Sequence, residues 1–209
     1  MEIPLEDRLA VREVCTDMDS FYINVAREVF PNACVVIDHY HVIAWGLHLL
    51  EELRRNLQVI HRKKFEVRHL LMKPAHKLIE EEYKKLQPCF EAFPEVKRAW
   101  KIIQQLRRVY WRATWKQACS ELRKTIWYCH QSMIPEMENL AKTLKRRKQE
   151  ILNYTISKTT NAFTEGSHTR FELIKRHHCG IRNIERFAKR LMFCFMPFTI
   201  IAQIFAQRC

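Results

Sequence analysis

Near the amino terminus, two short apolar runs flank one amphipathic segment. Residues 12–17 (REVCTD) and 34–38 (CVVID) are the apolar runs, and each ends in an acid. Residues 20–30, between them, place apolar side chains at helical spacing. A strand, a helix and a second strand in so short a span predict a βαβ unit with parallel strands. Asp17 and Asp38 then stand at the carboxyl ends of neighbouring strands, the edge at which α/β sheets bind their ligands.

Beyond Asp38 the pattern is helical almost to the end of the chain. Apolar residues recur every three or four positions, with breaks near the prolines at 74, 88, 94 and 135. The predicted helices cover residues 41–70, 76–86, 93–130 and 135–158. A polar break at 157–166 precedes a further helix, and more helix follows towards the carboxyl end. The predicted fold class is therefore α/β but predominantly helical.

The helix after the polar break is predicted to run from Glu165 to about Arg176, with Thr164 as its N-cap. Glu165, His168 and Arg176 share one face of this helix, because they recur at i, i+3 and i+11. An acid in a first helical turn is either a partner of the helix dipole or a functional group, and the pattern alone leaves both open.

Composition restricts the function classes. The chain has 36 Lys and Arg against 23 Asp and Glu, a formal net charge of +13, which favours a polyanionic partner, nucleic acid before an anionic membrane. Its three glycines argue against β-sandwiches, β-barrels and glycine-rich phosphate loops. Eight scattered cysteines without a CxxC pair predict reduced thiols rather than a zinc site. The apolar run at 191–206 is too short and too interrupted to predict a membrane span.

Three segments resemble the DDE transposases of bacterial insertion sequences of the ISL-three group. Residues 14–42 (VCTDMDSFYINVAREVFPNACVVIDHYHV) are similar to that family's strand–helix–strand block, which ends in D-x-F/Y-H-V. Residues 160–176 (TNAFTEGSHTRFELIKR) resemble its N-x-x-x-E-G-x-H/N helix, and residues 180–197 (GIRNIERFAKRLMFCFMP) resemble the G-x-R-N tail. Order and spacing agree over essentially the full chain.

The resemblance implies a ribonuclease-H-like catalytic core formed by residues 1–42 and 159–209, with a helical insertion at 43–158. In such enzymes three acids hold two Mg²⁺ ions at the phosphodiester. By motif position, Asp17 matches the second acid and Glu165 the last, so both are expected metal ligands and catalytic residues.

The remaining motif residues receive supporting roles. Asp38 and His41 match the D-x-x-H motif and are expected to brace the site, although Asp38 as a direct ligand stays open. His168 matches the end of the second motif. Asp19 competes with Asp17, but as a helix cap it has a simpler explanation. The basic residues expected to contact DNA are Lys145, Arg146, Arg147, Lys148, Lys175, Arg176 and Arg182.

One departure from the family pattern is large. The first catalytic acid should lie on an upstream strand, and only Glu2, Glu6 and Asp7 precede residue 12. We therefore expect a truncated catalytic domain that is inactive alone and binds Mg²⁺ poorly. Its expected partners are transposon-end DNA and a full-length transposase or a second copy, in the bacterial cytoplasm at the nucleoid, with no membrane. The alternative is a non-enzymatic, basic helical module that binds DNA or a transposase.

Overall fold

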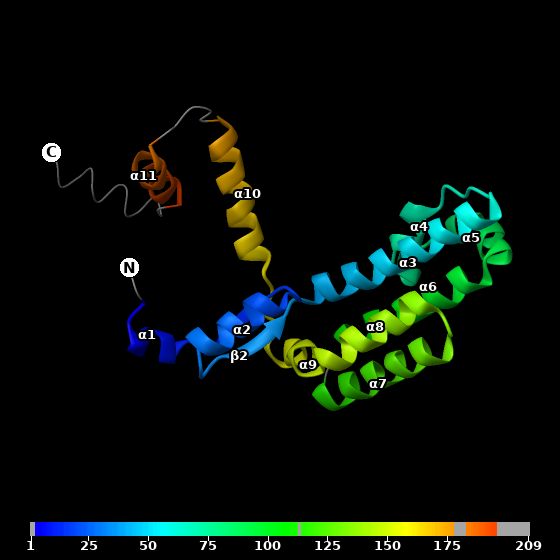
Figure 1. Ribbon diagram of the computed structural model, residues 1–209, viewed down its shortest axis with the longest axis horizontal. Helices are drawn as coiled ribbons and strands as arrows, with labels where there is room; N and C mark the ends of the chain where they lie inside the picture. Colours follow the sequence, from blue (N-terminus) through cyan, green and yellow to red (C-terminus); the bar gives the residue numbers. More distant parts are fainter. Residues whose placement is uncertain (1–2, 113, 178–182, 196–209) are drawn as a thin grey trace. The chain divides into compact units, whose positions relative to one another are not determined.

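The computed structural model describes residues 3–112, 114–177 and 183–195, and the chain forms two compact units, residues 1–160 and 161–209. The first unit contains α1 (Leu5–Ala10), β1 (Glu13–Thr16), α2 (Ser20–Val29), β2 (Cys34–Ile37), α3 (His39–His61), α4 (Arg68–Met72), the 3₁₀ turn η1 (Ala75–Lys77), α5 (Glu80–Ala92), α6 (Pro94–Trp111), α7 (Trp115–Gln131), α8 (Pro135–Arg146) and α9 (Lys148–Ser157). The second contains α10 (Ala162–His177) and α11 (Ile184–Phe195). The fold is predominantly helical, as predicted (Figure 1).

The predicted βαβ unit is present. Within the described residues, β1 and β2 form a two-stranded parallel sheet whose register pairs Glu13 with Cys34 and Thr16 with Ile37. Val35, Val36 and Ile37 are all buried although successive residues face opposite sides, so both faces of β2 are covered. Helices α2 and α9 contact this strand.

The helix α9 also covers the outer edge of β2. The side-chain amide of Asn153 donates a hydrogen bond to the backbone carbonyl of Val35 at 2.8 Å. The backbone amides of Cys34 and Asp38 donate to the backbone carbonyls of Arg12 and Thr16, on the side of β1. Because alternate residues of a strand direct their backbone groups to opposite sides, the Val35 carbonyl faces away from β1. Asn153 therefore satisfies a backbone group at the sheet edge.

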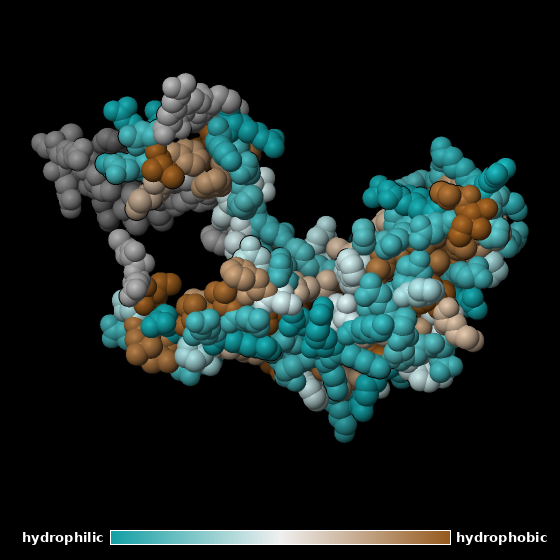
Figure 2. Space-filling model, in the orientation of Figure 1, coloured by the Kyte–Doolittle hydropathy of each residue, from teal (hydrophilic) through white to brown (hydrophobic). Residues whose placement is uncertain are grey.

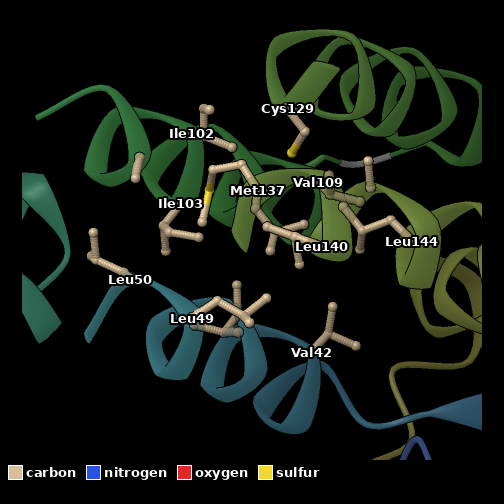
Figure 3. Packing of buried hydrophobic residues seen from close by; sticks show 14 of the residues in the cluster. Val42, Leu49, Leu50, Ile102, Ile103, Val109, Cys129, Met137, Leu140 and Leu144 are labelled. Atoms are coloured by element: carbon tan, nitrogen blue, oxygen red, sulfur yellow. The ribbon is translucent and has the colours of Figure 1, made fainter. Parts of the chain in front are cut away.

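A bundle of four helices forms the largest part of the rest of the core, to which α2, α4, α5 and α9 also contribute buried side chains. Helix α3 packs on α6 and α8, and α7 packs on the same two helices. Figure 3 shows side chains of α3, such as Leu49, facing Ile103 of α6 and Leu140 of α8, with α7 beyond them. The buried residues form one continuous hydrophobic cluster that includes both strand β2 and the bundle.

The chain divides once, between its two compact units, whereas the predicted domain division has two boundaries. The break after residue 160 lies close to the predicted boundary at 158/159. At 42/43 the packing is continuous, because Val42 and Ile43 belong to the same helix and the same core. The description of 43–158 as an insertion into a ribonuclease-H-like core thus stays a hypothesis about family architecture.

Several predicted helix boundaries were wrong. The expected helix 41–70 ends at His61, because Arg62 adopts a left-handed conformation with φ 50°. The expected helix 93–130 is two helices, and the Thr114 side chain caps the second by accepting from the Gln117 amide. Helix α5 continues through Pro88, which is exposed, so water can satisfy the carbonyl that loses its partner.

The expected helix 135–158 is likewise divided, at Arg147, whose backbone (φ −106°, ψ 20°) leaves the helical region. At this break its guanidinium donates a hydrogen bond to Ser20 Oγ of α2 at 2.6 Å. Helix α10 begins at Ala162 rather than Glu165, so Thr164 lies inside the first turn and is not the cap.

Candidate active site

Asp17 lies directly after β1, at the carboxyl end of the sheet, and lines a shallow hollow of about 410 Å³. Its Oδ1 accepts a hydrogen bond from the Asp19 amide at 2.9 Å, which holds the carboxylate at the turn into α2. The other residues that line the hollow are Met18, Asp19, His41, Ala44, Trp45 and His48. The structure thus brings Asp17 and His41 together.

Asp19 is the N-cap of α2, and its Oδ1 accepts from the Phe21 amide at 2.8 Å. This confirms the simpler explanation of Asp19 as a helix cap. Its carboxylate nevertheless borders the same hollow as Asp17.

Asp38 has a different environment from Asp17. It is only 4% exposed and caps α3, with Oδ1 accepting from the Tyr40 amide at 2.9 Å. His39 Nδ1 lies 3.1 Å from the same oxygen, and its ring packs against Tyr110 and Tyr154. Burial, with smaller contributions from Tyr154 and Asp38, raises the pKa of Tyr110 well above its usual value. Asp38 is thus enclosed at the start of the helix that carries His41.

Glu165 and His168 belong to the second compact unit. Glu165 is in the first turn of α10, and its amide donates to the Asn161 carbonyl at 2.9 Å. His168 packs against Phe171, which contacts Phe187 of α11, so α10 and α11 pair through aromatic side chains. Because Asp17 and Glu165 belong to different units, their sharing of a metal pair stays a prediction.

The expected DNA-contacting residues fall into two groups. Lys145, Arg146 and Lys148 are exposed at the junction of α8 and α9, and Lys175 and Arg176 are exposed at the end of α10. Arg182 lies outside the described residues.

Arg147 differs from its three neighbours. It is 7% exposed, its Nη2 donates to Ser20 Oγ, and its Nη1 lies 3.8 Å from Glu150 Oε1. Glu150 is also paired with Arg27 at 2.7 Å. The side chain of Arg147 therefore joins α8 and α9 to α2 and does not point to solvent, so we remove it from the expected phosphate contacts.

Sequence reasoning missed Trp45 and His48, which line the hollow with Asp17. Their rings stack with centroids 5.5 Å apart and an interplanar angle of 17°. The indole N–H of Trp45 is buried and has no hydrogen-bond partner among the described residues. The spacing His41, Trp45, His48 along one helical face was the available signal.

The donors in the hollow fit a magnesium ion in type but do not enclose one. Carboxylate oxygen is the ligand that Mg²⁺ prefers, and Asp17 offers it, whereas Asp19 Oδ1 is engaged as the cap of α2. Over the described ranges, no three His, Cys, Asp or Glu side chains gather closely enough to hold a metal ion. An incomplete protein cage is usual for Mg²⁺, which commonly uses one or two carboxylates together with substrate phosphates.

Comparison with known families tests the resemblance that the sequence motifs indicate. The sequence model of a family described as transposase, the DDE transposases of the ISL-three group, matches residues 1–191. The chain belongs to this family.

Curated proteins and solved structures give no match to it. The match supports a transposase function in general, and DDE transposases generally use divalent metal ions and DNA substrates. In the part of the chain that the structure describes, no helix is long and apolar enough to cross a membrane.

Proposed function

We propose that this chain carries part of the catalytic centre of a DNA transposase, in which Asp17 and Glu165 hold Mg²⁺ against a phosphodiester. The observation that carries the proposal is the position of Asp17, the motif acid, in an open hollow at the carboxyl end of a parallel strand. The family match supports a transposase function in general. The surrounding architecture would then be a ribonuclease-H-like core.

The protein's own residues would prepare this centre in defined ways. Asp19 holds the Asp17 carboxylate through its amide, and Asp38 fixes the start of α3 and with it His41. When bound, divalent ions in such a centre activate the attacking oxygen and stabilise the leaving oxygen.

We further propose that the 209-residue chain alone binds DNA without cutting it. It holds matches to two of the three acids that the family resemblance requires, and two carboxylates bind a metal pair weakly. Exposed Lys145, Arg146 and Lys148 would contribute phosphate contacts, because Arg147 fixes this cluster to α2 at Ser20, three residues after Asp17.

A metal-dependent DNA-binding assay tests the metal role without requiring cleavage. Millimolar Mg²⁺ should raise affinity for nicked duplex DNA relative to Na⁺ at matched ionic strength. Asp17→Asn and Glu165→Gln should each abolish that increase. Asp19→Asn is the matched control, because it removes a carboxylate from the same hollow but keeps a good helix cap.

The assay also separates the catalytic proposal from a simple binding module. If wild-type binding shows no Mg²⁺ dependence, or if Asp19→Asn acts as strongly as Asp17→Asn, the assigned metal site is wrong. Mg²⁺-dependent nicking by wild type that is lost in Asp17→Asn would support the site but refute the proposed inactivity of this chain.

A further inference from the structure

The outward face of α3 connects the Asp17 hollow to a second, basic hollow. His41, Trp45 and His48 line the first hollow, and His48 also lines the second, of about 770 Å³. The second hollow continues along the helix past Arg55 and beyond its end. The two hollows thus meet at His48 and follow one side of α3.

Helical spacing explains this continuity. Positions 41, 45, 48, 52, 55, 59 and 62 recur at intervals of three and four, so they form one stripe along the helix. The opposite side of α3 is buried against α6 and α8, where Figure 3 shows Val42 and Leu49. The stripe is therefore the side of α3 that these packing partners leave uncovered.

The far end of the stripe is positively charged. Residues 51–68 contain six Lys and Arg against three Glu. Glu51, which is buried, is paired with Arg54 and lies within 4 Å of Arg55 and Arg68. Arg62 and Lys63 are exposed and have no ion-pair partner among the described residues. These two cations are available to an external anion.

The length of the stripe matches a polyanion rather than a small ion. From His41 to Arg62 the helix rises about 30 Å at roughly 1.5 Å per residue. That is about nine base pairs of duplex DNA at roughly 3.4 Å per pair. Figure 1 shows α3 running from the end of β2 along the bundle to the region of α4, and the visible surface of the bundle is largely hydrophilic (Figure 2).

We propose that the outward face of α3 is a track for duplex DNA that leaves the Asp17 hollow, with phosphates bound by Arg62 and Lys63. The proposal rests on the proposed function, because Asp17 defines where the track begins. The stacked Trp45 and His48 rings stand at the junction of the two hollows and would contact the strand nearest the reacting phosphate.

Charge removal tests the track with a control on the opposite side of the bundle. Arg62→Gln with Lys63→Gln should weaken binding of a 20-base-pair duplex about tenfold near 0.1 M salt. It should also reduce the slope of log affinity against log salt by about 2, since two phosphate contacts are lost. The control is Lys116→Gln with Arg123→Gln on α7, which removes two exposed cations from a helix beyond α6 and α8 (Figure 3). It should change affinity less than twofold.

Crosslinking provides a second readout that does not depend on charge. A photoreactive residue at Val59, which is 78% exposed on the stripe, should crosslink to the duplex. The same residue at Trp127, exposed on α7, should not. Equal weakening by the two charge variants, or equal crosslinking at the two positions, would overturn the track.

These measurements are made in EDTA, so their outcome is independent of the metal. If the charge and crosslinking results contradict the track while Mg²⁺ still raises DNA affinity, this inference alone is refuted. An intact track without any Mg²⁺ effect would refute the proposed function and leave α3 as a DNA-binding surface.

Discussion

Replacement of Arg147 by alanine should destabilise the first unit, because its buried side chain joins α8 and α9 to α2. The side chain of Arg147 is 8% exposed and that of Glu150 is 5% exposed. Removal of one partner from a buried ion pair costs about 3 to 5 kcal/mol, because the other charge stays buried. Arg27 still holds Glu150 at 2.7 Å, so we expect a loss near the lower end, about 3 kcal/mol.

Thermal and urea unfolding measure this loss. For a unit of this size, about 3 kcal/mol corresponds to a fall in Tm of roughly 6 to 12 °C. The matched control is Arg146→Ala, which removes an exposed cation from the neighbouring position and should change stability by less than about 0.5 kcal/mol. A Tm equal to wild type in Arg147→Ala, or a larger loss in Arg146→Ala, would refute the assignment of Arg147 as a buried connection between α8, α9 and α2.

Three further outcomes follow from the buried groups. Burial raises the pKa of Glu51, but the hydrogen bonds and the charge of Arg54 outweigh burial and leave this pKa below its usual value. The ionised Glu51 therefore stabilises the fold above the unfolded pKa of about 4.3, and this stabilisation is lost as the pH falls below it. Glu51→Gln should therefore flatten the fall in unfolding free energy between pH 6 and pH 3, and an unchanged pH profile would contradict this. Burial raises the pKa of Cys129 to about 12, so at pH 8 iodoacetamide should modify exposed Cys34 long before Cys129, whereas equal rates would show that the bundle opens readily. Leu140→Ala should cost about 3 to 5 kcal/mol in urea unfolding, because the side chain is fully buried; a loss below about 1 kcal/mol would contradict the packing in Figure 3.

The sheet and the helical character could be predicted from local pattern. Strand β2 is a continuous apolar run because both of its faces are buried, and that pattern is visible without a structure. Helix ends were predicted less well. Arg62 ends α3 in a left-handed conformation that glycine usually adopts, and Arg147, where α8 ends, bonds to Ser20, 127 positions away. Neither signal is contained in the residues around the break.

In the candidate site, too, local sequence pattern predicted some features, and others depend on contacts between distant residues. Asp17 and Asp19 lie two residues apart, and the cap preference of α2 together with the family motif separated their roles. Four consecutive basic residues were predicted to act alike, but Arg147 faces inward and donates to the Ser20 hydroxyl. A cluster pattern does not say which of its members a distant residue binds. His48 was missed because a lone exposed histidine on a helix has no motif. Its place between two hollows depends on the packing of α3.

Iron-directed cleavage of the protein backbone tests most directly whether Asp17 and Glu165 hold the same metal. Fe²⁺ replaces Mg²⁺, and ascorbate with peroxide then produces hydroxyl radicals that cut the chain only near the bound ion. The account predicts two sets of cuts, around Asp17 and around Glu165, and Asp17→Asn and Glu165→Gln should each weaken both sets together. Asp19→Asn should leave both sets in place. Cuts near Asp17 that persist unchanged in Glu165→Gln, or cuts at only one of the two positions in wild type, would contradict a shared metal centre.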